Sequence, residues 1–232
     1  ALSIYVSDVV QTAEKNHKAP MGFVVKTQTK QYTCQHLIIA TGTTPKKLRL
    51  TGEKKCHSRG KIFYDFYDIP KKKYGESFTI VGSGDVAYDY ALNMASREYE
   101  VKLIQRTSKS KSLEILQNRV QKSSKIEVMR DLTLENIQLS PEKDLTLAFS
   151  ETGKSNIKKQ VLTDNLLVAI GREPNLQCLS KPLRDNYRRK KRTKNLHFIG
   201  DVVAGTFRQI SIAMGSGTKL AMELIENHQD IE

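Results

Sequence analysis

The stretch Phe78-Thr79-Ile80-Val81-Gly82-Ser83-Gly84-Asp85-Val86-Ala87 decides the fold. Four β-favouring residues run into a Gly-x-Gly-x-x-Ala turn, and a helical pattern then extends from Asp85 to about Ser96. Strand, glycine turn and helix in this order are typical of a dinucleotide-binding unit. Gly82 permits the tight turn, Gly84 leaves room for a pyrophosphate, and Ala87 lets the helix pack close to the strand. We therefore predict a nucleotide site at Gly82, Ser83, Gly84, Asp85 and Ala87, with a plain strand–helix turn as the alternative.

The next predicted strand, residues 99–106, bears on the choice of nucleotide. An acidic residue at its end, about twenty residues beyond the glycines, would bind the ribose 2′-hydroxyl of NAD. This sequence instead continues with Gln105, Arg106, Thr107, Ser108, Lys109 and Lys111. Positive charge and hydroxyl groups suit a 2′-phosphate, so Arg106, Thr107 and Lys111 favour NADP over NAD. A basic surface loop is the alternative.

The amino-acid composition limits the classes of protein to which the chain can belong. The 232 residues are 38% hydrophobic, enough to bury a core, and no run of 18 apolar residues predicts a membrane helix. We expect no signal peptide, and three distant cysteines without CxxC or metal spacing indicate reduced thiols and a cytoplasmic protein. The net charge of +13 suits nucleic acid, an acidic protein, a membrane surface, anionic cofactors or plain solvation, and charge alone does not choose.

Hydrophobic periodicity predicts an α/β fold around this unit. An antiparallel meander leads into a strand that we expect to be buried on both sides, residues 37–40. Residues 46–61 have the composition of a surface connection. Further strands are predicted at residues 3–7, 21–29, 31–33, 126–129, 132–139, 145–149, 161–170 and 196–199, and helices at 113–122 and 210–227.

Three strand ends carry a family resemblance: Ala40-Thr41-Gly42, Ala169-Ile170-Gly171-Arg172-Glu173-Pro174-Asn175, and Gly200-Asp201, which is followed by Arg208-Gln209. Together they resemble the thioredoxin-reductase-like flavoproteins with two dinucleotide-binding domains. The resemblance implies a Rossmann-like NAD(P)H-binding domain at 61–171, inserted in a partial FAD-binding domain of residues 1–60 and 172–232. It implies further that FAD contacts Thr41, Gly42, Gly171, Gly200, Asp201, Arg208 and Gln209.

One departure from that family changes the expected chemistry. Its redox CxxC would fall on Asp65 and Asp68, and carboxylates cannot perform thiol–disulfide exchange. The sequence is more similar to the ferredoxin–NAD(P) reductase members that lack the dithiol. That similarity implies hydride transfer from NAD(P)H to FAD, then electron transfer to an acidic ferredoxin- or flavodoxin-type carrier, in a homo-oligomer. We predict no catalytic side chain and interpret the two aspartates as part of a solvated linker, with an acid–base pair as the alternative.

The family's first Gly-x-Gly-x-x-Gly motif, which binds the ADP half of FAD, does not occur in this sequence. We therefore expect an incomplete FAD-binding domain, in a fragment, in half of a split flavoprotein or in a degenerate relative. The rival function is a non-catalytic nucleotide-binding or assembly subunit. The cationic run 188–192 is interpreted as an exposed loop, with a nucleic-acid patch and a docking surface for an electron carrier as the alternatives.

Overall fold

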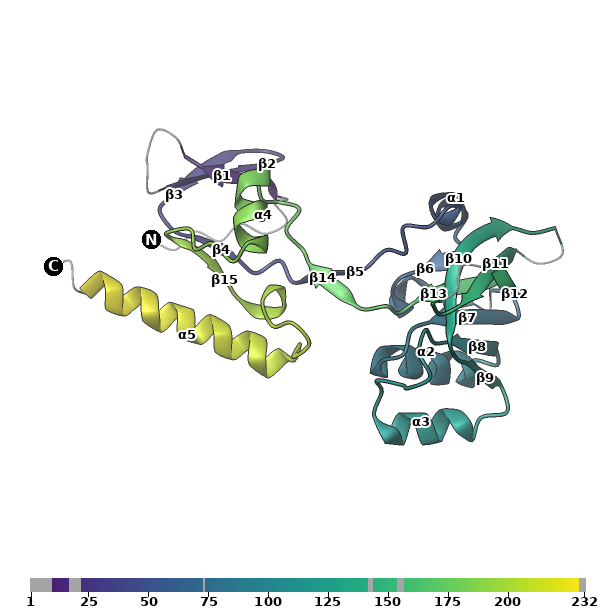
Figure 1. The fold of residues 1–232 in the computed structure, drawn as a ribbon. Helices are drawn as coiled ribbons and strands as arrows, with labels where there is room; N and C mark the ends of the chain where they lie inside the picture. The colour runs from purple at the N-terminus through teal and green to yellow at the C-terminus, as the bar shows by residue number, and fades with distance from the viewer. Residues whose placement is uncertain (1–9, 17–21, 73, 142–143, 154–156, 230–232) are drawn as a thin grey trace. The chain divides into compact units, whose positions relative to one another are not determined.

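The chain forms two compact units in a computed structural model that describes residues 10–16, 22–72, 74–141, 144–153 and 157–229 (Figure 1). Unit 1 comprises residues 1–44 and 173–232, and unit 2 comprises Pro45–Arg172. The strand predicted at residues 3–7 lies outside the described residues. The chain passes between the units in two segments, β5 (Thr43–Pro45) and β14 (Arg172–Pro174), which form a two-stranded sheet.

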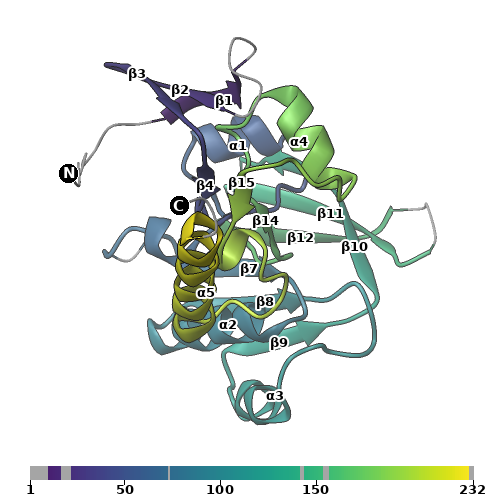
Figure 2. The same cartoon turned by 90° about the vertical axis from the view of Figure 1, so that its left-hand side faces the viewer.

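A five-stranded parallel sheet forms the centre of unit 2 and confirms the predicted α/β fold class. The glycine turn joins its middle strand to α2 (Asp85–Ser96), which packs on one face of the sheet together with α3 (Glu114–Gln121) (Figures 1 and 2). In spatial order the strands are β6 (Ile62–Phe63), β13 (Asn165–Val168), β7 (Ser77–Val81), β8 (Glu100–Ile104) and β9 (Ile126–Met129).

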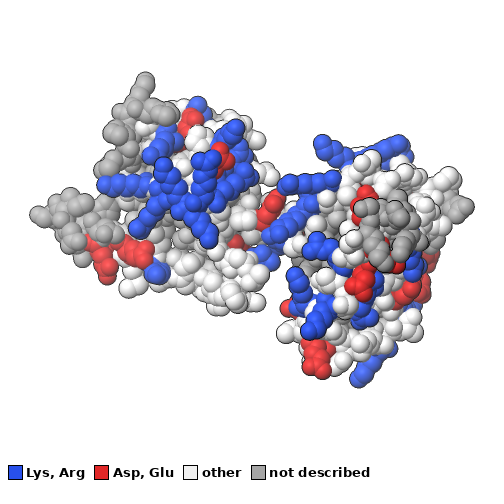
Figure 3. Space-filling model, viewed as in Figure 1, with Lys and Arg blue, Asp and Glu red and all other residues white. Residues whose placement is uncertain are grey.

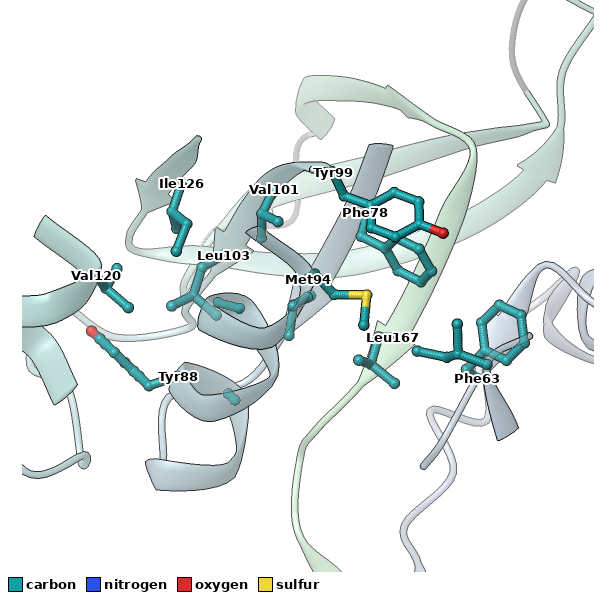
Figure 4. Close-up of a cluster of buried hydrophobic side chains, with 14 of the residues drawn as sticks. Phe63, Phe78, Tyr88, Met94, Tyr99, Val101, Leu103, Val120, Ile126 and Leu167 are labelled. Atoms are coloured by element: carbon teal, nitrogen blue, oxygen red, sulfur yellow. The ribbon is translucent and has the colours of Figure 1, made fainter. Parts of the chain in front are cut away.

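The core between this sheet and α2 follows from the alternation of side chains along each strand (Figure 4). Phe78 of β7 and Leu103 of β8 are fully buried there, against Tyr88 and Met94 of α2. Burial of each such side chain contributes about 1.5–3 kcal/mol. The strand–turn–helix of residues 78–96 is therefore anchored by its own apolar residues.

The opposite face of the sheet is covered by an antiparallel meander of β10 (Leu132–Leu139), β11 (Leu145–Glu151) and β12 (Ile157–Thr163). Its second core includes Leu147, Phe149 and Leu166. The single strand predicted at 161–170 is wrong, because β12 belongs to the meander and β13 to the parallel sheet. The chain changes sheets at Asp164, whose carboxylate accepts hydrogen bonds from the backbone N–H groups of Glu76 and Ser77 at 2.8 and 2.9 Å.

Residues 46–61 are not a plain surface connection, contrary to the prediction. They contain α1 (Glu53–Ser58), and Cys56 is 1% exposed within the second core of unit 2. Leu48 and Leu50 pack against the same cluster. The lysines around α1 lie on its outer side and give the segment its polar composition.

Unit 1 has an antiparallel sheet of β1 (Val10–Lys15), β2 (Phe23–Thr27) and β3 (Gln31–Cys34), which confirms a meander. β4 (Leu37–Ile39) pairs in parallel with β15 (Leu196–Phe198). β4 is not buried on both faces as predicted, since Ile38 is 44% exposed while Ile39 is buried. The helical elements are α4 (Lys181–Arg188), the short 3-10 helix η2 (Gly200–Val202) and α5 (Ile210–Gln229).

Candidate functional site

The glycine turn lies beside the end of the neighbouring strand β13. The Ala169 N–H donates to the carbonyl of Val81 at 2.8 Å, and the Gly82 N–H donates to the carbonyl of Ile104 at 3.0 Å. A Cβ atom at Gly82 would meet the carbonyl oxygen of Ala169 at 2.4 Å and the Cβ of Ala87 at 2.8 Å. The chain continues from β7 to β8 on one side, whereas β13 lies on the other, so the turn occupies a point where the strand order reverses.

The start of α2 faces open space. Gly84 is the N-cap residue and provides no side-chain cap, and a Cβ placed on it would meet no atom within 4 Å. The first N–H groups of an α-helix have no partner within the helix, and they carry the positive end of its dipole. An anionic group can therefore approach this turn without a steric barrier.

The basic loop after β8 is tied to the glycine turn. The carbonyl of Ser83 accepts hydrogen bonds from the Lys111 N–H at 2.8 Å and the Ser110 hydroxyl at 3.1 Å. The carboxylate of Asp85 accepts a third, from the Leu113 N–H at 2.7 Å. The role of Ser110 is not evident from the sequence, where the alternating serines of residues 108–112 are the only signal.

This loop presents cations at its surface. Arg106, Thr107 and Lys111 are exposed, and the Thr107 hydroxyl donates to the carbonyl of Lys109 at 2.9 Å. Gln105 is instead fully buried, with its Nε2 donating to the hydroxyl of Tyr88 at 2.6 Å. The cations Arg106 and Lys111 thus extend from a loop that is fastened to the glycine turn.

The segment 65–68, where the family resemblance would place a redox dithiol, is packed within unit 2. Asp65 is half-buried, pairs with the guanidinium of Arg172 at 3.5 Å and accepts a hydrogen bond from the Tyr67 N–H at 3.3 Å. The Phe66 ring stacks on Tyr90 at 5.9 Å, whereas Asp68 is exposed. The predicted solvated linker is therefore wrong for Asp65, and its ion pair with Arg172 also argues against an acid–base pair with Asp68.

In unit 1, short contacts bring two of the predicted FAD segments against other elements. The Thr41 hydroxyl donates to the carbonyl of Asn175 at 2.5 Å, and the Asn175 N–H donates to the carbonyl of Gly42 at 2.9 Å. The Gly200 N–H donates at 2.8 Å to the hydroxyl of Ser216, which fastens the Gly-Asp turn to α5.

The other residues that were predicted to contact FAD make mostly local contacts. Asp201 is half-buried and makes no side-chain hydrogen bond in the part of the chain that the structure describes. Arg208 donates to the carbonyl of Gly205 at 2.9 Å, and the carbonyl of Gln209 accepts the Ala213 N–H at 3.0 Å in the first turn of α5. Gly171 lies in unit 2, where its carbonyl accepts the Lys46 N–H at 3.0 Å.

The thiols are separate from these segments. Cys34, Cys56 and Cys178 are free, and burial raises the pKa of each above its ordinary value. A raised pKa keeps a thiol protonated and unreactive. Within the described residues there is no cluster of three potential metal ligands, and no helix is long and apolar enough to cross a membrane.

The known proteins that this chain is similar to are oxidoreductases of one kind. The family model described as pyridine nucleotide-disulphide oxidoreductase matches residues 4–217. Thioredoxin reductase of Bacillus subtilis is 28% identical over 213 residues, which cover 87% of this chain and 66% of that protein. Dihydrolipoyl dehydrogenase of Mycoplasma genitalium is 26% identical over 205 residues, 77% of this chain and 40% of that protein. The chain thus spans less than two thirds of the length of both relatives.

Among solved structures, the thioredoxin reductase of Lactococcus lactis in its FR conformation superposes with a TM-score of 0.79. It is 22% identical in sequence, and the match covers 94% of this chain and 73% of that one. This likeness shows a shared fold.

Proposed function

The chain belongs to the pyridine nucleotide-disulphide oxidoreductase family, and from this premise we propose that it takes part in flavin-dependent NAD(P)H oxidation without a dithiol. Unit 2 binds NAD(P)H in this proposal, and unit 1 supplies part of the FAD site. The observation that carries the proposal is the glycine turn beside Ala169, at the carboxyl edge of β7 and β13. Dinucleotides bind at such reversal points in parallel sheets.

The residues of unit 2 fit the nucleotide. Gly84 leaves open space in front of α2, where a pyrophosphate would accept hydrogen bonds from the first N–H groups of the helix. Arg106 and Lys111 would place positive charge near the adenosine ribose, which favours NADP over NAD. The Ser83 carbonyl and the Asp85 carboxylate hold this loop beside the turn, and their place in the nucleotide site stays a prediction.

The residues of unit 1 fit one part of a flavin site. Asp201 offers a carboxylate that is free of hydrogen bonds within the described residues, next to α5. The turns at Gly42 and Gly200 adopt positive φ values of 65° and 71°, which favour glycine. When bound, FAD would supply the hydride-accepting chemistry. The chain's own contribution is to bind and orient, since no general acid or base is needed for that transfer.

We infer the class of electron acceptor from the positive surface charge and from the state of the three thiols. The relatives include thioredoxin reductases, but this chain has Asp65 and Asp68 where a dithiol would stand, and its three thiols have raised pKa values. We therefore favour a one-electron carrier. Figure 3 shows Lys and Arg side chains gathered over the region of α4. The cationic residues on and just after this helix are Lys181, Arg184, Arg188, Arg189, Lys190, Lys191, Arg192 and Lys194. An acidic ferredoxin or flavodoxin would be steered to such a surface.

Two measurements test the proposal. Calorimetric titration with NADPH and NADH should give saturable binding, with NADPH the tighter ligand, and incubation with FAD should leave a yellow protein after gel filtration. A chain that binds neither nicotinamide nucleotide nor FAD contradicts the proposal.

For the acceptor, Arg189→Glu with Lys191→Glu should weaken flavodoxin binding at least tenfold at low salt. The matched change in unit 2, Arg119→Glu with Lys122→Glu, should leave that affinity within twofold.

A non-catalytic assembly subunit is the second candidate. The observation in its favour is the set of exposed apolar side chains on and before α5, which would suit contact with another chain: Phe207, Ile210, Ile212, Met214, Met222 and Ile225. This candidate predicts NAD(P)H binding without FAD uptake, together with a stable complex in which these side chains are covered. A homo-oligomer stays a prediction under either function, and analytical ultracentrifugation tests it.

A further inference from the structure

A pocket of about 760 Å³ opens beside α1 in unit 2. This volume falls within the range of about 300–1,000 Å³ that is common for small-molecule sites. The residues that line it come from segment 47–57 and from Tyr64, and none belongs to the glycine turn or to the basic loop at 106–113. The pocket is therefore separate from the proposed nucleotide site.

Cations dominate the rim of the pocket: Lys47, Arg49, Lys54 and Lys55. All four side chains are exposed. Figure 3 shows Lys and Arg side chains at the upper edge of unit 2, where Figure 1 labels α1. Glu53 is the one acidic residue among the lining residues. Four positive charges against one negative charge make the pocket attractive to an anion.

The carboxylate of Glu53 is buried and accepts hydrogen bonds from neighbouring residues of unit 2. Its side chain is only 7% exposed, one carboxylate oxygen accepts the hydroxyl of Tyr64, and the other accepts the Leu50 N–H at 3.0 Å. Burial and the bond to Glu53 raise the pKa of Tyr64, so its hydroxyl remains a donor. The carboxylate therefore holds Leu50 and Tyr64 in place and does not pair with the cations that the structure describes at the rim of the pocket.

The floor of the pocket is apolar. Leu50 and the ring of Tyr64 line it, and the aliphatic stems of the lysines extend the apolar surface toward the rim. The ammonium group of Lys47 lies 3.3 Å from the centroid of the Tyr64 ring, a cation–π contact that fixes its position. The ring of His57 lies 5.6 Å from the same ring. An apolar floor below a cationic rim suits an organic body that carries an anionic group.

We propose that this pocket binds a phosphorylated small molecule, with its phosphate at the rim and its organic body on Leu50 and the aliphatic stems of the lysines. Phosphate is favoured over a carboxylate because Lys and Arg together bind its three oxygens in several directions. The inference goes beyond the proposed function, because it adds a second anion site to unit 2 that does not involve NAD(P)H.

Three probes separate the two parts of the recognition: phenyl phosphate, inorganic phosphate and phenol. Each is titrated into the ¹⁵N-labelled full chain and followed by backbone amide shifts. Phenyl phosphate should cause saturable shifts at Gly52–His57, inorganic phosphate should bind there at least fivefold more weakly, and phenol should cause no saturable shift. Raising the salt concentration should weaken phenyl phosphate binding.

A matched pair of variants gives the control. Lys47→Ala with Arg49→Ala should raise the dissociation constant for phenyl phosphate at least tenfold, whereas Lys71→Ala with Lys72→Ala, an equal loss of charge outside the pocket, should change it less than twofold. Shifts that do not saturate, equal weakening in both variants, or shifts confined to residues 82–87 overturn the proposal. NADPH binding reports on the glycine turn in the same spectra, so failure of the pocket and failure of the proposed function are distinguishable.

Discussion

The carboxylate of Asp85, in the first turn of α2, accepts a hydrogen bond of 2.7 Å from the backbone N–H of Leu113 at the start of α3. The same loop is held by the carbonyl of Ser83, which accepts the Lys111 N–H at 2.8 Å. The glycine turn and the basic loop therefore form one structural unit. A change in the conformation of the turn should therefore alter the positions of Arg106 and Lys111.

Asp85→Ala should destabilise the chain by about 1–2 kcal/mol, because it removes a charge-assisted hydrogen bond and leaves the Leu113 N–H without this acceptor. Urea denaturation followed by circular dichroism measures the loss. Asp85→Asn keeps an acceptor oxygen and should recover more than half of it. Asp89→Ala, an exposed acidic residue on the same helix, is the control. Equal effects of Asp85→Ala and Asp89→Ala would contradict the proposed tether.

Gly82 and Gly84 should respond differently to the same substitution. Gly82→Ala places a Cβ 2.4 Å from the Ala169 carbonyl oxygen, and we expect about 1–3 kcal/mol of destabilisation from the forced rearrangement. Gly84→Ala meets no atom within 4 Å and should leave the free energy of unfolding nearly unchanged. It should nevertheless weaken NADPH binding at least tenfold, because its methyl group occupies the approach to the helix. Calorimetry and urea denaturation on both variants separate the two roles, and unaltered NADPH affinity in Gly84→Ala would place the pyrophosphate elsewhere.

Arg106→Ala should reduce the preference for NADPH over NADH. Loss of one charge-assisted contact to a 2′-phosphate corresponds to about 1.5–3 kcal/mol, or roughly a 10- to 150-fold weaker NADPH complex. NADH affinity should change less than threefold, since that ligand has no 2′-phosphate. Arg119→Ala on α3 is the exposed control. If Arg106→Ala weakens both nucleotides equally, Arg106 acts through the fold of the loop rather than by selecting the phosphate.

Local patterns predicted the parallel-sheet part of unit 2 well because its elements are strongly periodic. Helix 113–122 and strand 126–129 correspond to α3 and β9, since their apolar residues repeat with the spacing of one buried face. The predicted single strand at 161–170 failed because an apolar run does not indicate a change of sheet. That change depends on Asp164 and its bonds to Glu76 and Ser77, which are distant in sequence.

The pocket beside α1 shows a second limit of sequence analysis. Lys54, Lys55 and His57 give the segment a polar composition, although Cys56 between them is buried. A six-residue helix is too short for a clear periodic signal, and its burial depends on contact with the meander. The bond between Glu53 and Tyr64 likewise became visible only in the folded chain.

Tyr64→Phe should destabilise unit 2 by about 1–3 kcal/mol, because it removes the hydroxyl donor from a buried carboxylate. Tyr64→Phe with Glu53→Leu should cost less than the sum of the two single changes, since the double variant leaves no buried charge without a donor. Thermal and urea denaturation of the four proteins complete the cycle. Additive losses would mean that the two side chains do not stabilise one another.

The stacked pair His36 and His197 should make unit 1 sensitive to acid. The ring nitrogens Nδ1 of His36 and Nε2 of His197 lie 3.1 Å apart, and the ring centroids are separated by 5.4 Å. Burial lowers the pKa of His197 below its ordinary value of 6.5, the electrostatic effects of the neighbouring His36 and Arg192 lower it further, and Glu223 opposes them.

The sign of the effect follows from that lowered pKa. The unfolded chain binds a proton at His197 more readily than the folded chain, so stability is fully present above pH 6.5 and is lost as the pH falls through the folded pKa. Urea midpoints between pH 8 and pH 5 should therefore decrease, and His197→Gln should flatten that decrease while it retains a polar side chain. The ¹H–¹⁵N spectrum of the imidazole gives the folded pKa directly. A value at or above 6.5 would remove the physical basis of the prediction, because the folded state would then favour the protonated ring.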